Sequence, residues 1–128
     1  MRYFSVLFIL CTTSVFGEDT TAAIFGAVVR PGQYKLTSSE GLHDLIIKAN
    51  GLRDGAAVQE ITIKRNEKLY QFDALKIIEA GVDIALANKD TVFIMDSFGG
   101  LHGDKLAEYN EAIGQFVKRT PKQLKVIE

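Results

Sequence analysis

The chain has 128 residues, 47% of them hydrophobic, and a formal net charge of −1. This length suits one domain with a hydrophobic core, and the charge balance excludes a strongly basic protein that binds nucleic acid or anionic membranes through charge. Cys11 is the only cysteine, so the chain cannot form an internal disulfide.

The first residues have the layout of a secretory signal peptide. An apolar stretch follows Arg2 and runs to Cys11, and small and polar residues then lead to Gly17. A positive start, an apolar core of roughly 7–15 residues and a small residue at the cleavage site are typical of such signals. We expect residues 1–17 to be cleaved near Gly17 and the mature protein to lie in the periplasm or cell envelope. A buried N-terminal strand or helix is the alternative.

Two strands and a turn are predicted next. Residues Ala22–Arg30 are rich in β-branched and aromatic side chains, and Gln33–Thr37 alternates polar with apolar residues, as strands do. Between them, Pro31 restricts its own φ angle and Gly32 tolerates a positive one, which favours a tight turn. We therefore expect the two strands to pair as a hairpin.

A helix is predicted after this hairpin. The segment Thr37–Glu40 fits a capping box, in which a hydroxyl and a carboxylate accept hydrogen bonds from free backbone N–H groups. Apolar residues then recur at the spacing of one helical face, and Asn50-Gly51 supplies a stop. The predicted apolar face consists of Leu42, Leu45, Ile46 and Ala49.

A second hairpin and a last strand are predicted further along. Glu60–Arg65 and Leu69–Phe72 alternate in polarity on either side of a short turn. Asp73 can then cap a short helix over Ala74–Ala80. The mostly apolar segment Thr91–Met95 is expected to be a central strand that is buried on both faces.

This order of elements predicts an α+β domain over residues 22–96, with one helix packed across a β-grasp sheet. The glycine-rich residues 97–103 are expected to form a hinge. An amphipathic helix is predicted over residues 104–118, and the charged residues 119–128 are expected to be a loose tail. The apolar stripe of that helix either docks on the core or binds a partner.

Four segments in this order resemble the SLBB family, whose name stands for soluble ligand-binding β-grasp domains. They are the hairpin Ile24–Tyr34, the helix and stop Leu42–Leu52, the strand Ile61–Arg65 and the last strand Asp90–Ile94. The resemblance covers about Ala22 to Met95, although the family often has glycine where this chain has Lys89. Because family members recur in bacterial polysaccharide export proteins, the resemblance implies ligand binding or a role in envelope polysaccharide export.

The first hairpin carries the candidate ligand contacts. Arg30 can donate from a planar fork of N–H groups, and Tyr34 offers a ring and a hydroxyl, which suits sugars or acidic groups. Other motif residues are expected to serve the backbone and the fold. The residues with these motif or structural roles are Gly26, Pro31, Gly32, Gly51 and Asp90.

No catalytic or metal-binding group is predicted. His43 and His102 lack partners at ligand spacing and are expected to lie on the surface. The segment Gly99–Gly103 lacks the spacing of a phosphate-binding loop and is expected to be a flexible connector. Since the carboxylates form no recognisable acid–base pair, we expect no enzyme activity, no metal and no cofactor.

The predicted function is therefore an exported, non-enzymatic module that binds a soluble ligand, with polysaccharide as the expected ligand or envelope polysaccharide export as the expected setting. The alternative is a protein–protein assembly module. In that case, the edge of the β-grasp sheet and the C-terminal helix would bind an export complex or other copies of the chain. Neither hypothesis involves nucleic acid or a membrane span in the mature chain.

Overall fold

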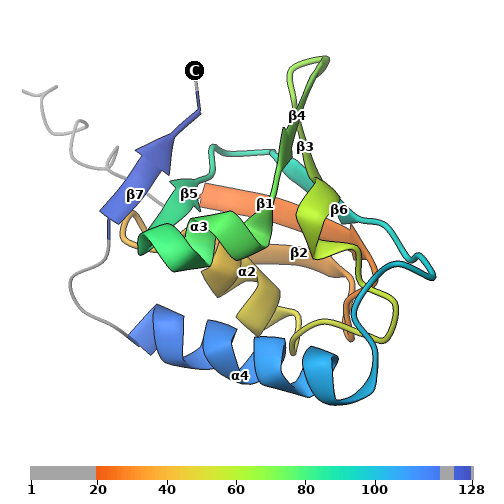
Figure 1. The fold of residues 1–128 in the computed structure, drawn as a ribbon. Helices are drawn as coiled ribbons and strands as arrows, with labels where there is room; N and C mark the ends of the chain where they lie inside the picture. The colour runs from red at the N-terminus through yellow and green to blue at the C-terminus, as the bar shows by residue number, and fades with distance from the viewer. Residues whose placement is uncertain (1–19, 119–122, 128) are drawn as a thin grey trace, which may run out of the picture.

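Strands and helices follow one another along the chain as Figure 1 shows. The structure is a computed structural model that describes residues 20–118 and 123–127, so the predicted signal peptide lies outside it. The elements are β1 (Thr20–Gly26), β2 (Gly32–Leu36), α2 (Leu42–Lys48), the 3-10 helix η1 (Val58–Glu60), β3 (Ile61–Arg65), β4 (Lys68–Phe72), α3 (Ala74–Ala80), β5 (Val82–Ala85), β6 (Thr91–Ile94), α4 (Gly103–Lys118) and β7 (Gln123–Val126).

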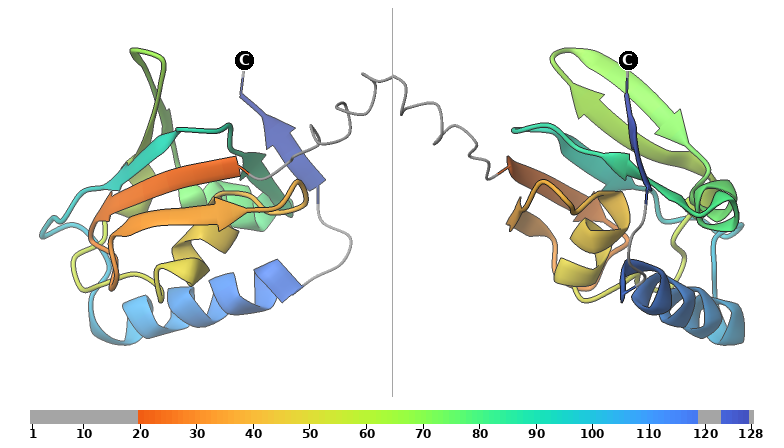
Figure 2. Two further views of the ribbon diagram at one scale, coloured as in Figure 1. Left: turned by 180° about the vertical axis from the view of Figure 1, so that it is seen from behind. Right: turned by 90° about the vertical axis from the view of Figure 1, so that its left-hand side faces the viewer.

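Five of the strands form one mixed sheet in the order β2-β1-β6-β3-β4. The central strand β6 is parallel to β1 and antiparallel to β3, while β1–β2 and β3–β4 are antiparallel hairpins. Helix α2 packs against β1 and β2, and seen from behind these strands lie in front of it (Figure 2, left). The combination of this sheet with helices is the predicted α+β class.

The first strand is shorter than predicted because β1 ends at Gly26. Gly26 has a φ angle of 98°, and a Cβ there would lie 2.1 Å from the carbonyl oxygen of Ile94. Only glycine allows this conformation and this close approach without strain. Gly32 is already paired within β2, so the chain reverses over residues 27–31 and not in a tight turn at Pro31-Gly32.

Helix α2 buries its predicted apolar face, but its cap differs from the prediction. Asp44 accepts a hydrogen bond from the N–H of Gly41 at 2.8 Å, which makes Gly41 the N-cap. Glu40 instead accepts from the N–H of Thr37 at 2.9 Å and closes the turn before the helix. Two successive pairs with capping spacing both form their hydrogen bonds, and the second pair starts the helix.

The second hairpin and the short helix agree with the prediction. Between β3 and β4, Asn66 and Glu67 have φ angles of 51° and 74°, as a two-residue type I′ turn requires. Asp73 caps α3 by accepting hydrogen bonds from the N–H groups of Leu75 and Lys76. Both features depend on neighbouring residues alone, which is why the sequence predicts them.

Strand β6 is central as predicted, but it is not buried on both faces. Val92 and Ile94 are buried, whereas Phe93 between them is 45% exposed. On β1, the neighbouring Phe25 is 43% exposed on the same face. In the described part of the chain, helices cover one face of the sheet only, and the side chains of Phe25 and Phe93 on the opposite face are exposed.

The C-terminal helix α4 docks on the rest of the fold. Its residues Tyr109, Ile113 and Phe116 are buried, and it packs against α2. Beyond it, Gln123–Val126 forms β7 parallel to β5, where a loose tail was expected. None of the described helices has both the length and the apolar character needed to cross a bilayer.

The glycine-rich segment after β6 is held in place, which differs from the expected hinge and flexible connector. The N–H groups of Ser97 and Leu101 donate to the carbonyl oxygens of Gly55 and Ala56 at 2.8 and 3.0 Å. The N–H of Gly55 donates back to the carbonyl of Leu101 at 2.8 Å. These bonds tie the segment to the loop before η1.

Candidate functional site

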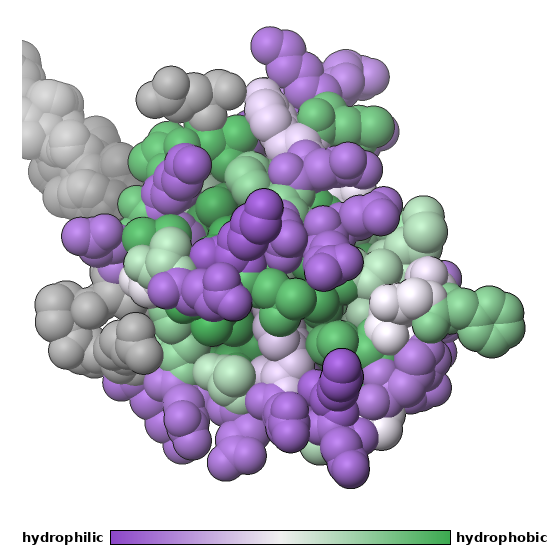
Figure 3. Space-filling view, viewed as in Figure 1, coloured by the Kyte–Doolittle hydropathy of each residue, from purple (hydrophilic) through white to green (hydrophobic). Residues whose placement is uncertain are grey.

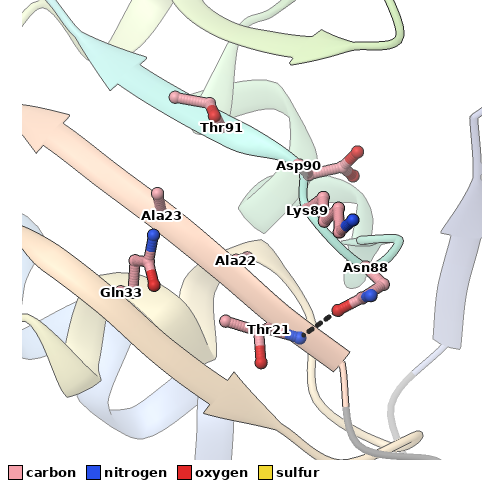
Figure 4. Close-up of a pocket in the computed structure, with 8 residues that line it drawn as sticks. All are labelled: Thr21, Ala22, Ala23, Gln33, Asn88, Lys89, Asp90 and Thr91. Carbon is pink, nitrogen blue, oxygen red and sulfur yellow. Dashed lines mark hydrogen bonds between the residues drawn. The ribbon is translucent and has the colours of Figure 1, made fainter.

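The open face of the five-stranded sheet contains a polar hollow of about 430 Å³ (Figure 4). Strands β1, β2 and β6 form its floor, and the loop before β6 forms its wall. Its lining residues are Thr21, Ala22, Ala23, Gln33, Asn88, Lys89, Asp90 and Thr91. It lies on the side of the sheet that no described helix covers.

Strand register places the floor residues. Ala23 pairs with Gln33 on β2 and with Thr91 on β6, so the three residues lie in one row across the sheet. Because Ala22 is fully buried and side chains alternate along a strand, Thr21 and Ala23 face outward. The small side chain of Ala23 leaves a depression between the amide of Gln33 and the hydroxyl of Thr91 (Figure 4).

The loop before β6 forms the wall of the hollow through bonds to β1. The side-chain oxygen of Asn88 accepts from the N–H of Thr21 at 2.9 Å. The carbonyl of Thr21 accepts from the N–H of Lys89 at 2.7 Å, and the N–H of Ala23 donates to the carbonyl of Asp90. Lys89 has a φ angle of 74°, which turns the chain into β6 and leaves its side chain exposed.

Asp90 anchors this loop with its carboxylate and does not present a charge to the hollow. Arg65 donates from Nε to Oδ1 at 2.9 Å and from Nη2 to Oδ2 at 2.7 Å. The N–H of Ala87 also donates to Oδ2, and Asp90 is 1% exposed. The hydrogen bond to Asp90 raises the pKa of Arg65 against the opposing effect of its burial. The carboxylate points away from Gln33 in Figure 4.

Two aromatic rings lie one row further along the sheet. Phe25 on β1 pairs in register with Phe93 on β6, roughly 7 Å from the row of Ala23 and Thr91. Both rings are nearly half exposed, and Met95 beyond them is 50% exposed. The open face therefore places hydrogen-bonding side chains next to flat apolar ones. That arrangement can bind a ligand that has a polar edge and an apolar face.

A second polar group is buried in the core. His43 was expected on the surface, but the ring is fully buried and lies 2.9 Å from Asp83 through Nδ1. Its Nε2 lies 3.4 Å from the hydroxyl of Tyr109. The expectation failed because His43 adjoins the apolar face of α2, and β5 supplies a carboxylate from 40 residues away.

Charge and hydrogen bonding explain this buried group. Burial opposes ionisation of Asp83, but hydrogen bonds from His43 and the N–H of Ile84 outweigh it and hold the pKa of Asp83 below its ordinary value. Burial, with a smaller effect of nearby carboxylates, raises the pKa of Tyr109. These groups join α2, β5 and α4. They are shielded from any substrate, since His43 and Asp83 are fully buried and Tyr109 is 6% exposed.

The other histidine lies on the surface as expected. His102 contacts Asp54 through Nδ1 at 3.0 Å and the carbonyl of Phe98 through Nε2 at 3.2 Å. The hydrogen bond to Asp54 raises the pKa of His102. Among the described residues, no three His, Cys, Asp or Glu side chains gather as metal ligands would.

Comparison with protein families identifies the fold. Residues 20–94, more than half of the chain, match the family model of the SLBB domain. The chain belongs to the SLBB domain family. The match is shifted by two residues at each end from the predicted domain at 22–96, and the β-grasp fold predicted for it is confirmed. A search of curated proteins finds no match.

The SLBB domain does not bring its predicted contact residues into the hollow. Tyr34 pairs with the buried Ala22, so its ring packs on the core side of β2. Its hydroxyl donates to the carbonyl of Arg30, whose side chain is exposed in the loop over residues 27–31. Pro31 is exposed in the same loop. The contact with Tyr34 closes the hairpin, which gives that residue a structural role.

The hollow is formed by residues that the motifs did not single out. Gln33 lies next to Tyr34 in the same strand but faces the other way, and Thr91 alternates with the buried Val92. Alternation along the strands could have placed both on the outer face. Only the sheet order shows that they are neighbours. Of the motif residues, Gly51 has a φ angle of 91° in the turn that follows α2.

Proposed function

We propose that this SLBB domain is an exported, non-enzymatic module that binds a glycan on the open face of its sheet, in an envelope polysaccharide system. The observation that carries this proposal is the polar hollow beside the Phe25–Phe93 pair. A sugar ring has hydroxyl groups around its edge and an apolar C–H face. The amide of Gln33 and the hydroxyl of Thr91 suit the edge, and an exposed ring suits the face.

Three further points support the proposal. Membership of the SLBB family supports ligand binding, and the signal-like residues 1–17 support export. The side chains best suited to proton transfer, His43, Asp83 and Tyr109, are buried in the core away from the open face. A binding role thus uses the features of the open face, whereas catalysis would leave them unexplained.

The proposal predicts where a glycan binds. In a titration of the ¹⁵N-labelled protein with a broad panel of oligosaccharides, we expect chemical-shift changes at Ala23, Gln33 and Thr91. The double substitution Phe25→Ala and Phe93→Ala should weaken binding by about tenfold or more, because each exposed ring contributes packing area. Phe98→Ala is the matched control, since Phe98 is fully exposed but lies outside the sheet.

Two results would contradict glycan binding on this face. One is the absence of shift changes on the open face across the whole panel. The other is an equal loss of affinity in the control variant and in the double variant. In either case, the aromatic pair and the hollow would not form the binding surface.

Assembly with a second copy is the other candidate function, and one feature favours it. A groove of about 510 Å³ lies between the edge strand β4 and the segment of β7, lined by residues that include Tyr70, Phe72 and Val126. Apolar side chains gather over this part of the molecule (Figure 3), and on the opposite side of β4 Leu69 is 67% exposed. The stripe of α4, by contrast, is already buried inside the fold.

Sedimentation distinguishes this candidate. If two copies pair along β4, the protein should form a dimer at high concentration, and Leu69→Lys should restore the monomer because it places a charge on the edge strand. A monomer at every concentration would exclude pairing along β4 as the function.

A further inference from the structure

Charge is unevenly distributed between the sheet and the rest of the fold. The chain has 16 acidic residues, yet the five strands of the sheet contain none. The same strands contain four basic residues, namely Lys35, Lys64, Arg65 and Lys68. The acidic residues are therefore confined to helices, loops and the other segments, although the chain as a whole is nearly neutral.

Three lysines surround the hollow on the open face. Lys35 on β2 pairs in register with Thr21, and Lys64 on β3 pairs with Thr91, so each lies beside a lining residue. Because Leu36 and Ile63 are buried, their neighbours Lys35 and Lys64 project outward. Lys89 lines the hollow from the loop before β6.

No described carboxylate neutralises these three lysines. The ion pairs of the described residues involve other side chains, and Lys35, Lys64 and Lys89 are exposed. Asp90 also lines the hollow, but Arg65 and the N–H of Ala87 occupy its carboxylate. The hollow therefore presents ammonium groups from three sides around a neutral polar floor.

We infer that the ligand of this face is an acidic glycan, whose sugar rings carry carboxylate groups. This inference rests on the proposed glycan-binding function and names the class of sugar. Three separate ammonium groups on different strands and a loop fit a chain with repeated charges better than a single anion. The Phe25–Phe93 pair fits the apolar face of a ring, which a polyanion without sugar rings lacks.

A matched pair of sugars tests the inference. Oligogalacturonate carries one carboxylate on each ring, and its methyl ester has the same backbone without the charge. With the full chain, we expect the acid to bind about tenfold more tightly than the ester at low salt, because several exposed ion pairs add small contributions. The difference should shrink at about 0.5 M salt, where screening is strong. Inorganic polyphosphate of similar length should bind more weakly than the oligogalacturonate.

Lysine variants locate the charge effect. Replacing Lys35, Lys64 and Lys89 together by glutamine should remove the preference, so that the variant binds the acid and the ester with equal affinity. Replacing the same three by arginine should keep the preference. Replacing Lys48, Lys76 and Lys105 by glutamine changes the net charge equally but alters the helices α2, α3 and α4 instead, so the preference should remain.

The outcomes separate this inference from the proposed function. Equal binding of acid and ester on the open face would keep glycan binding and overturn the acidic ligand. A preference that is lost equally in both glutamine variants, or polyphosphate that binds as tightly as the acid, would also overturn it. Absence of binding by both sugars and by the wider oligosaccharide panel would overturn the proposed function itself.

Discussion

Lys89 is a lysine in a backbone conformation that favours glycine. Its φ angle is 74°, in the turn that leads into β6. A left-handed conformation costs a residue with a Cβ about 1–2 kcal/mol. Glycine avoids this cost, but its larger loss of entropy on folding cancels part of the advantage. Lys89 therefore lowers the free energy of unfolding relative to glycine at this position. A role of its side chain in the lining of the hollow would account for that cost.

We expect Lys89→Gly to raise the free energy of unfolding by roughly 0.5–1 kcal/mol. Lys35→Gly is the control, because Lys35 is an exposed lysine in the regular strand β2, where glycine should lower stability by a similar amount. Urea denaturation measures both changes. A lower stability of Lys89→Gly would show that the side chain at this position contributes more than its backbone strain costs.

Asp83 is the hydrogen-bond acceptor at the centre of the buried group formed with His43 and Tyr109. It accepts from the ring of His43 at 2.9 Å and from the N–H of Ile84 at 2.8 Å. Asp83→Asn would weaken these bonds and remove the charge, and we expect a loss of about 3 kcal/mol at pH 7. Asp54→Asn, which alters the exposed pair with His102, should change stability much less.

The pH dependence of this effect has a definite sign. The folded-state pKa of Asp83 lies below its ordinary value, so its contribution is complete above the unfolded pKa of about 4 and is lost as the pH falls through the folded pKa. The difference in unfolding free energy between the wild type and Asp83→Asn should therefore shrink in acid. A difference that stays constant from pH 7 to pH 2 would contradict the ionised state of Asp83.

At the scale of elements, two glycines should respond in opposite ways to the same substitution. A Cβ at Gly26 would meet the carbonyl of Ile94 where β1 ends against β6, whereas a Cβ at Gly114 in α4 would have no atom within 4 Å. We expect Gly26→Ala to destabilise the protein by more than about 2 kcal/mol. Gly114→Ala should stabilise it by about 0.5–1 kcal/mol, because alanine favours the helix.

Thermal or urea unfolding of the two glycine variants checks this pair. Equal effects of the two substitutions would mean that the end of β1 adapts to a side chain. The contact between Gly26 and β6 would then not set the length of the strand.

Several elements that depend on neighbouring residues agree with the sequence prediction, although the tight turn at Pro31-Gly32 and the cap at Thr37–Glu40 do not. Pairings between distant residues were predicted less well. The cap of Asp73 is local and is found, and the turn expected over residues 66–68 is found one residue shorter, at Asn66-Glu67. Strand β5 was not predicted, because its partner strand β7 lies 41 positions later in the chain. The two-sided burial of β6 was also wrong, since the apolar residue Phe93 faces solvent.

At the scale of the whole molecule, β5 and β7 show how the end of the chain completes the fold. Removing residues 123–128 would leave β5 without its parallel partner. We expect faster hydrogen exchange at the amides of Val82–Ala85 and little change in β6, which pairs within the other sheet. Unchanged exchange in β5 would show that the packing of α2 and α3 alone protects this strand.

The sequence by itself determined the family of this protein and most of its elements, but not the paired strands β5 and β7. Capping residues, turn residues and alternation act over a few positions, and the ordered motifs from Ala22 to Met95 identified an SLBB domain. Only the tertiary structure decided the candidate site. Gln33 and Thr91 are 58 positions apart, and they flank Ala23 because β6 pairs with β1 in parallel. Tyr34 lies outside the hollow for a simpler reason. It is adjacent to Gln33 in β2, and adjacent residues of a strand face opposite sides of the sheet.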